Sequence, residues 1–130
     1  MALNSFALNK PVTVSNFQAT FMATIDGNRC KTISELFKEI SSVFHFPEYF
    51  GNNFDALYDC LTDLEWLGVD HIYLLITHPA LICSEEDDSQ ARIAFDELFK
   101  DVLDSFQEHP IHFNIIAEPS FLQTVIPTGL

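Results

Sequence analysis

The chain has 130 residues, a size at which one compact domain is expected, and 48% of them are hydrophobic, which excludes a disordered chain. No apolar run reaches the ~18 residues of a membrane span, and the start carries no basic region before an apolar segment. We therefore expect a cytoplasmic protein that does not contact membranes. The three cysteines are odd in number and lack CxxC spacing, so neither a disulfide framework nor a zinc site is expected.

The charge is strongly acidic. Six Lys and Arg stand against 19 Asp and Glu, a formal net charge of -13, and residues 39–91 contain no Lys or Arg. Such a surface repels phosphates, so we expect no direct binding of nucleic acid. It attracts a basic partner and speeds the encounter with it. Solubility alone is the other explanation of this charge.

The first third of the chain predicts an extension, a strand and a helix. Residues 1–16 form a polar leader, with a short edge strand at residues 12–14 as an option. From Phe17 to Ile25 apolar and polar residues alternate, as in a half-buried strand, and a turn follows at residues 26–28. Thr32 and Glu35 fit a capping box, which begins a helix that ends before Pro47.

A loop at residues 48–52 leads to a second helix, for which Asn53 is the expected N-cap. Three acids, Asp55, Asp59 and Asp63, lie four residues apart on one side of this helix. Like charges at this spacing destabilise an isolated helix by about 0.2–0.5 kcal/mol per pair. A solvated helix face explains them most simply, although the repeated cost invites a functional explanation. The opposite side is an apolar stripe of Phe54, Leu57, Leu61 and Leu64.

The remaining elements are two strands and a long helix. The apolar run at residues 72–76 is typical of a strand buried on both faces. An acidic segment at residues 84–90 precedes an amphipathic helix that stops before Pro110, and alternation at residues 111–117 predicts a last strand. The last dozen residues show no usable periodicity. This order predicts an α/β fold, a small parallel sheet packed by helices. The inward residues of the long helix are predicted to be Ile93, Phe95, Leu98, Phe99, Val102, Leu103 and Phe106.

Residues 47–62, PEYFGNNFDALYDCLT, closely resemble the barstar family of ribonuclease inhibitors. The match covers roughly residues 21–63 and continues beyond them only in element order and hydrophobic pattern. It implies a three-stranded parallel sheet in one domain at residues 17–118, with an N-terminal extension at 1–16 and a C-terminal tail at 119–130. It also implies an immunity or toxin–antitoxin role, in which a monomer binds a small basic ribonuclease one to one. An acidic helix and the loop before it would plug the active site.

Carried over position by position, the resemblance assigns partner-binding roles to this loop and helix. Tyr49 resembles the loop aromatic that packs on the nuclease, although a position at the edge of the core is the alternative for it. Gly51 and Asn53 resemble the residues that shape the loop. Asp55 and Asp59 resemble the two carboxylates inserted among the enzyme's cationic groups, where Asp59 would stand in for a substrate phosphate.

Several positions depart from the family pattern. Tyr58 stands where the best-known member has Trp, Asp63 where it has Gly, and Phe50 where it has Tyr. We keep Tyr58 and Asp63 among the partner-binding residues, together with Asp104 and Glu108, which correspond to acids on the last helix. Phe50, Phe54 and Leu57 are assigned to packing, Cys60 to a buried position, and Trp66 to no role.

Two alternative functions remain open. The same fold can bind a toxin with another activity, since the acidic surface would serve either target. A hydrolase could use Asp55 and Asp59, because paired carboxylates are the material of glycosidases and hard-metal sites. However, neighbours on one helix face converge poorly on opposite sides of a substrate, and no His lies at metal-ligand spacing near them. We therefore expect no catalytic residue, no metal and no cofactor.

Overall fold

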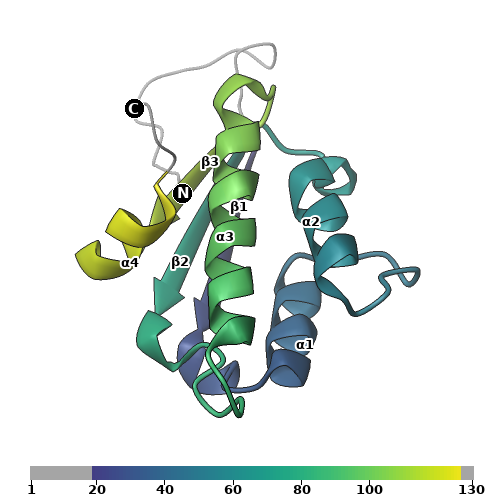
Figure 1. Ribbon diagram of the computed structural model, residues 1–130. Helices are drawn as coiled ribbons and strands as arrows, with labels where there is room; N and C mark the ends of the chain where they lie inside the picture. Colours follow the sequence, from purple (N-terminus) through teal and green to yellow (C-terminus); the bar gives the residue numbers. More distant parts are fainter. Residues whose placement is uncertain (1–18, 127–130) are drawn as a thin grey trace.

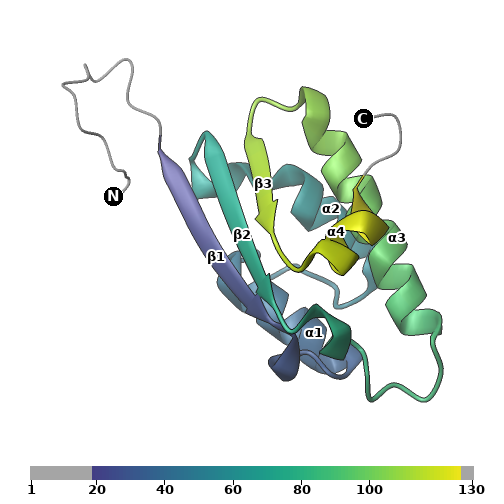
Figure 2. The same cartoon turned by 90° about the vertical axis from the view of Figure 1, so that its left-hand side faces the viewer.

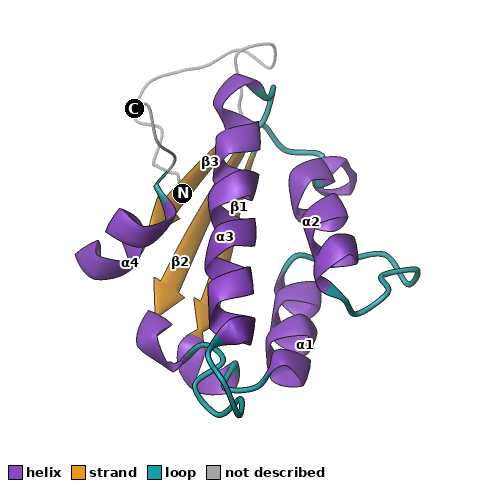
Figure 3. Cartoon of the chain, in the orientation of Figure 1, coloured by secondary structure: helices purple, strands orange, loops and turns teal. Residues whose placement is uncertain are grey.

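A computed structural model of the chain describes residues 19–126. Its centre is one sheet with the strand order β1-β2-β3, in which both neighbouring pairs are parallel. Four helices, α1 to α4, pack with this sheet (Figures 1 and 3). The expected α/β fold with a three-stranded parallel sheet is thereby confirmed. The strands are β1 (Thr20–Asp26), β2 (His71–Thr77) and β3 (His112–Ile116), and the helices are α1 (Ile33–Val43), α2 (Phe54–Asp63), α3 (Gln90–Ser105) and α4 (Pro119–Val125).

The start of α1 has the capping box that the sequence predicts. The Glu35 amide donates to Oγ1 of Thr32 at 3.1 Å, and Oε1 of Glu35 accepts from the Thr32 amide at 3.3 Å. A third cap comes from far along the chain, because Oε2 of Glu86 accepts from the Ile33 amide at 2.6 Å. The acidic segment before α3 therefore satisfies an amide at the start of α1 that the helix itself leaves unpaired.

The end of β1 is shaped by a close approach between two chain segments. A Cβ at Gly27 would overlap the backbone carbonyl of His78, which follows β2. Only glycine therefore allows the turn after β1 to pack at this place. The Asp26 carboxylate accepts from the Asn28 amide, which lowers the pKa of that carboxyl. Phe17 and the optional strand at residues 12–14 lie outside the described residues.

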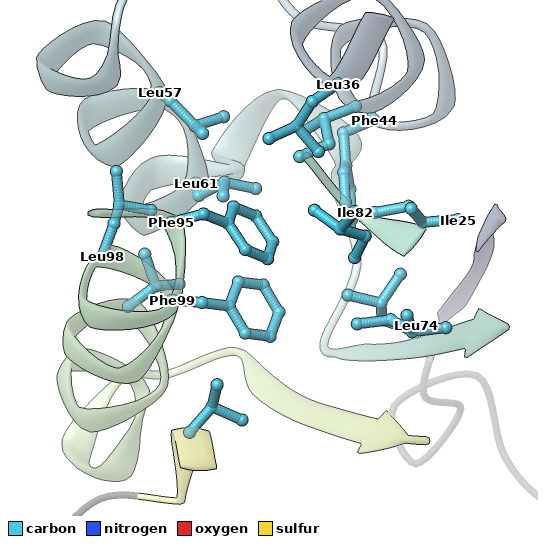
Figure 4. Close-up of a cluster of buried hydrophobic side chains, with 14 of the residues drawn as sticks. Ile25, Leu36, Phe44, Leu57, Leu61, Leu74, Ile82, Phe95, Leu98 and Phe99 are labelled. Atoms are coloured by element: carbon cyan, nitrogen blue, oxygen red, sulfur yellow. The ribbon is translucent and has the colours of Figure 1, made fainter. Parts of the chain in front are cut away.

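All four helices lie on the same side of the sheet (Figure 2). Side chains of α2 and α3 point from this side toward the strands (Figure 4). Burying this layer supplies the main favourable term of folding, because apolar area leaves water on both the helices and the strands. Fully buried members of this core include Ile25, Leu36, Leu57, Leu61, Leu74, Phe95 and Phe99.

Two expectations about burial were wrong. β2 is not buried on both faces, because its residues alternate between buried and exposed, and Leu75 keeps 40% of its surface. The reason is that every helix covers the same face of the sheet, so the other face receives no helix. Ile93 was expected to point inward, yet it is 44% exposed on α3.

The segment without usable periodicity contains a helix, α4. Phe121 and Val125 are buried, and the Arg92 guanidinium of α3 lies 5.8 Å from the centre of the Phe121 ring. Two apolar residues four apart hold this short helix on the core, too few for a periodic pattern in the sequence. The division of the chain at residues 16 and 118 stays a prediction. Within residues 19–126, no helix is long and apolar enough to cross a membrane.

Candidate partner-binding surface

The loop between α1 and α2 rests on aromatic side chains. The ring of Phe50 lies 5.0 Å from that of Phe46 and 5.9 Å from that of Phe37, which is buried on α1. Trp66 packs against Phe46 at 6.0 Å, and its Nε1 donates to the Phe44 carbonyl at 3.0 Å. Edge-to-face contacts of this kind stabilise a fixed arrangement. The loop is therefore attached to the core on its inner side.

The sequence assigned no role to Trp66, and the structure gives it this one. It is the only tryptophan of the chain. In the sequence it comes three residues after the end of α2, and so it is separated from the loop by the whole of that helix. Nothing in the local pattern connects it with Phe44, 22 residues earlier. The packing role expected for Phe50 and Phe54 is confirmed, since both contact Phe37.

Asn53 joins the loop to α2 through both ends of its amide. Its Oδ1 accepts from the Ala56 amide at 2.8 Å, which confirms the expected N-cap, and its Nδ2 donates to the Gly51 carbonyl at 3.3 Å. Asn52 turns the chain with a φ of 55°. A Cβ at Gly51 would lie 3.2 Å from Nδ2 of Asn53, so a side chain there would press on this amide. The geometry of the junction thus depends on both residues.

Tyr49 points away from the core. Its side chain is 79% exposed, although its neighbour Phe50 is packed inward, so the alternative of a core-edge aromatic does not hold. Tyr58, one turn into α2, is also exposed. Large exposed aromatics are common anchors of protein interfaces.

The first two acids of α2 carry charge that no neighbouring cation neutralises within the described residues. Asp55 and Asp59 are exposed, and within residues 19–126 neither carboxylate forms a hydrogen bond or an ion pair. The buried residues Leu57, Cys60 and Leu61 fix the rotation of α2 and thereby turn these carboxylates outward. Burial raises the pKa of the Cys60 thiol, and the charges of its acidic neighbours raise it further. The expected buried position of Cys60 is confirmed.

Asp63, the third acid of the series, has a local structural partner. Its Oδ1 accepts from the Glu65 amide at 3.2 Å and so caps the short 3₁₀ turn Glu65–Leu67 that follows α2. The turn begins after Leu64, which adopts a left-handed conformation with a φ of 55° although its side chain is fully buried. Asp63 therefore supports the end of α2, whether or not it also contacts a partner.

Asp104 and Glu108 lie on other elements than the rest of the predicted residues. Asp104 is in the last turn of α3 and Glu108 in the 3₁₀ turn Phe106–Glu108, and both are exposed. In Figure 1, α3 ends at the top of the molecule, where α2 also ends, whereas the loop at residues 44–53 projects from the start of α2. No bond among the described residues joins these two acids to α2 or its loop.

The structure thus brings together part of the predicted set on one short stretch of chain. We call this stretch the binding surface after the role predicted for it, which stays a prediction; it consists of Tyr49, Gly51, Asn53, Asp55, Tyr58 and Asp59. Within the part of the chain that is described, no group of three or more His, Cys, Asp or Glu residues is arranged to hold a metal ion.

The fold and this surface define a small α/β protein that presents an acidic helix and a firmly packed loop. The chain belongs to the barstar family: the family model described as Barstar (barnase inhibitor) matches residues 20–118. It is also similar to the "Putative ribonuclease inhibitor YrdF" of Bacillus subtilis (strain 168), with 45% identity over 38 residues. That match covers 29% of this chain and 42% of the relative, less than half the length of either.

Proposed function

We propose that this protein inhibits a small basic ribonuclease by covering its active site with the binding surface, in a one-to-one complex. Membership of the barstar family and the name of the similar Bacillus protein support the class of function. The observation that carries the mechanism is the pair of exposed carboxylates, Asp55 and Asp59, which have no partner among the described residues, together with the exposed ring of Tyr49 on the loop before them. In this proposal the protein is a binding protein and not an enzyme.

The chemistry of a nuclease explains why such a surface would block it. A site that cleaves RNA must hold cationic groups that stabilise the charge developing on the phosphate. A carboxylate on a rigid helix can form charge-assisted hydrogen bonds with the same groups, in two-point fashion where the group is Arg. Asp59 would replace a substrate phosphate, and Asp55 would meet a second cation. Tyr49 and Tyr58 would supply contact area around them.

Preorganisation favours this use of the loop. Binding costs free energy when mobile side chains and loops become ordered. Here Asn53 clamps the Gly51 carbonyl, and Phe50 is packed on α1, so the loop has its shape before the partner arrives. A complex formed by this surface would therefore lose little free energy in ordering the loop.

The biological role that follows is protection of the cell against a toxin nuclease, with the protein acting in the cytoplasm. To protect the cell, the inhibitor must bind the nuclease before the nuclease cleaves cellular RNA, so the two proteins must associate quickly. The net charge of -13 and the lack of Lys or Arg at residues 39–91 would steer a basic enzyme toward α2.

The test is affinity capture from lysate of the source cells, followed by an RNA-cleavage assay of the captured protein. Wild type is compared with Asp59→Lys and with Asp101→Lys, which makes the same change of charge at an exposed position of α3. We expect wild type and Asp101→Lys to retain a small basic protein whose RNA cleavage they inhibit. Asp59→Lys should retain and inhibit far less.

Each other result has a definite meaning. Equal capture by all three proteins would show that α2 is not the interface. Equal loss in both variants would show that net charge, and not the surface, governs binding. If only Asp59→Lys fails to capture a protein that lacks nuclease activity, the surface is the interface. The target is then a toxin of another activity, which is the alternative function.

A further inference from the structure

The sheet has a face that no described helix covers. Alternation along the strands places three complete rows of three residues on it, which the parallel pairing aligns, and then the pair Asp26–Thr77 at the ends of β1 and β2. All four helices lie on the opposite side (Figure 2). We call the nine residues of the three rows the open face. The rows are Thr20–His71–His112, Met22–Tyr73–Asn114 and Thr24–Leu75–Ile116.

The composition of the open face is unusual for a surface of this protein. Of the whole chain 19% is charged, yet none of the nine residues is Asp, Glu, Lys or Arg, and the charge nearest along this side of the strands is Asp26 at the end of β1. Met22 keeps 75% of its surface and Ile116 keeps 54%, and Tyr73 and Leu75 between them are also exposed. Four of the nine, Met22, Tyr73, Leu75 and Ile116, are large exposed apolar residues, and such a group on a folded domain marks a surface that something covers.

A buried polar atom on the same face also lacks a partner. The Nε2 of His71 is buried, and among the described residues it has no hydrogen-bond partner. The His71 ring stacks on that of His112, with the centroids 4.7 Å apart. A buried ring nitrogen is expected to be paired. This nitrogen would gain a partner if a further segment of backbone or side chains covered the face.

We propose that residues 1–18 of this chain fold back over the open face and cover it. The segment joins the sheet at the required place, since β1 begins at Thr20, in the same row as His71 and His112. Only one of the 18 residues, Lys10, is charged. Nine are hydrophobic, namely Met1, Ala2, Leu3, Phe6, Ala7, Leu8, Val12, Val14 and Phe17.

The length of the segment is sufficient. Eighteen extended residues reach at most about 60 Å, whereas a seven-residue strand spans about 23 Å. The segment can therefore turn at the start of β1 and run along the sheet with residues to spare. Ser15 and Asn16, which directly precede Phe17, are residue types that favour such a turn.

Two arguments favour this occupant over a second copy of the chain. The segment is tethered beside the face, so its effective concentration is on the order of millimolar. A second copy would bring another charge of -13 close to the first, and like net charges oppose association. The proposal is independent of the proposed function, because the binding surface lies on the helical side of the sheet.

The experiment uses the full chain and follows amide hydrogen exchange of residues 12–17, with sedimentation velocity to measure the mass. Leu75→Lys places a charge on the open face, and Ile93→Lys places the same charge on α3, at a residue of nearly equal exposure, 44% against 40%. We expect a monomer whose residues 12–17 exchange at least about tenfold more slowly than an unstructured chain. Leu75→Lys should abolish this protection, and Ile93→Lys should preserve it.

The proposal is overturned if residues 12–17 of wild type exchange at the rate of an unstructured chain. It also fails if their protection survives Leu75→Lys in a folded protein, since the segment would then be docked elsewhere. A wild-type mass of two chains, with the strands protected and residues 12–17 unprotected, would assign the face to a second copy. Met22→Lys on the same face repeats the test if Leu75→Lys does not fold.

Discussion

The Asp59 carboxylate forms no hydrogen bond or ion pair within residues 19–126, and this distinguishes it from acids that stabilise the fold. Asp96 forms an ion pair with Arg92 at 2.9 Å, and Asp63 caps a turn through the Glu65 amide. Exposed charges without such contacts add little to stability. The energetic consequences of changing Asp59 are therefore expected in the complex and not in the folded chain.

Replacing Asp59 with Ala should weaken the complex with the nuclease at least about a hundredfold, because a cationic group of the enzyme would be left buried and unpaired. The free energy of unfolding should change by less than about 0.5 kcal/mol, as for other exposed positions. Calorimetric titration gives the first quantity and urea denaturation the second. Asp101→Ala is the control, and unchanged affinity for Asp59→Ala would remove this residue from the interface.

The Asn53 side chain makes two hydrogen bonds, one that caps α2 and one that holds the Gly51 carbonyl. Two substitutions separate their contributions. Asn53→Ala removes the acceptor for the Ala56 amide and should lower the free energy of unfolding by about 1 kcal/mol. Asn53→Asp keeps this acceptor but cannot donate to the Gly51 carbonyl, so it should cost less than half as much. Both should speed dissociation of the complex. Equal stability losses for the two variants in urea denaturation would contradict the division of roles.

At the scale of elements, the loop at residues 44–53 is held from behind by residues that do not reach its outer surface. Phe37 lies on α1, and Trp66 lies in the 3₁₀ turn after α2. Helix α1 and the turn after α2 therefore both supply aromatic side chains that pack against the loop. This arrangement separates residues that support the loop from residues, such as Tyr49, that are exposed on it.

Substitution of Trp66 with Phe should distinguish support from contact. The variant keeps an aromatic ring against Phe46 but leaves the Phe44 carbonyl without its donor, which costs about 1 kcal/mol of stability. Tyr49→Ala should change stability by less than about 0.5 kcal/mol and weaken binding instead. Thermal or urea unfolding and titration of both variants check this. A stable Trp66→Phe would mean that the hydrogen bond does not hold the loop.

For the whole molecule, the uneven distribution of charge matters more than any one pair. The three ion pairs that involve Lys or Arg in the described range all lie outside α2: Arg29–Glu39, Lys31–Glu85 and Arg92–Asp96. The acids of α2 therefore contribute to a field that acts over distances longer than a bond. At 0.15 M ionic strength such a field reaches about 8 Å before it is screened.

Raising the salt concentration from about 0.05 to about 0.5 M should lower the association rate of the complex at least about tenfold. The dissociation rate should change by less than about threefold, because the contacts formed at close range are screened less. Stopped-flow fluorescence of Trp66, the only tryptophan of the chain, can measure both rates. An association rate independent of salt would rule out electrostatic steering.

Much of this protein could be predicted because the relevant interactions are local. The capping box of Thr32 and Glu35 and the N-cap Asn53 each connect residues three apart, so they are visible in the sequence. Alternation in β1 and helical spacing in α1 to α3 likewise depend on near neighbours. The acidic series of α2 is visible for the same reason. Even the parallel sheet follows from element order, since helical crossovers join its strands.

What only the tertiary structure decided involves residues far apart in the chain. The exposure of Leu75 depends on which side of the sheet the helices pack against, and the residues next to Leu75 in the sequence do not determine that side. The contact of Trp66 with the Phe44 carbonyl and the cap of Glu86 on Ile33 span 22 and 53 residues. The separation of Asp104 from the loop depends on how α3 packs beside α2. Local patterns reflect hydrogen bonds within a few residues, whereas these features arise from packing between elements, which no short stretch of sequence contains.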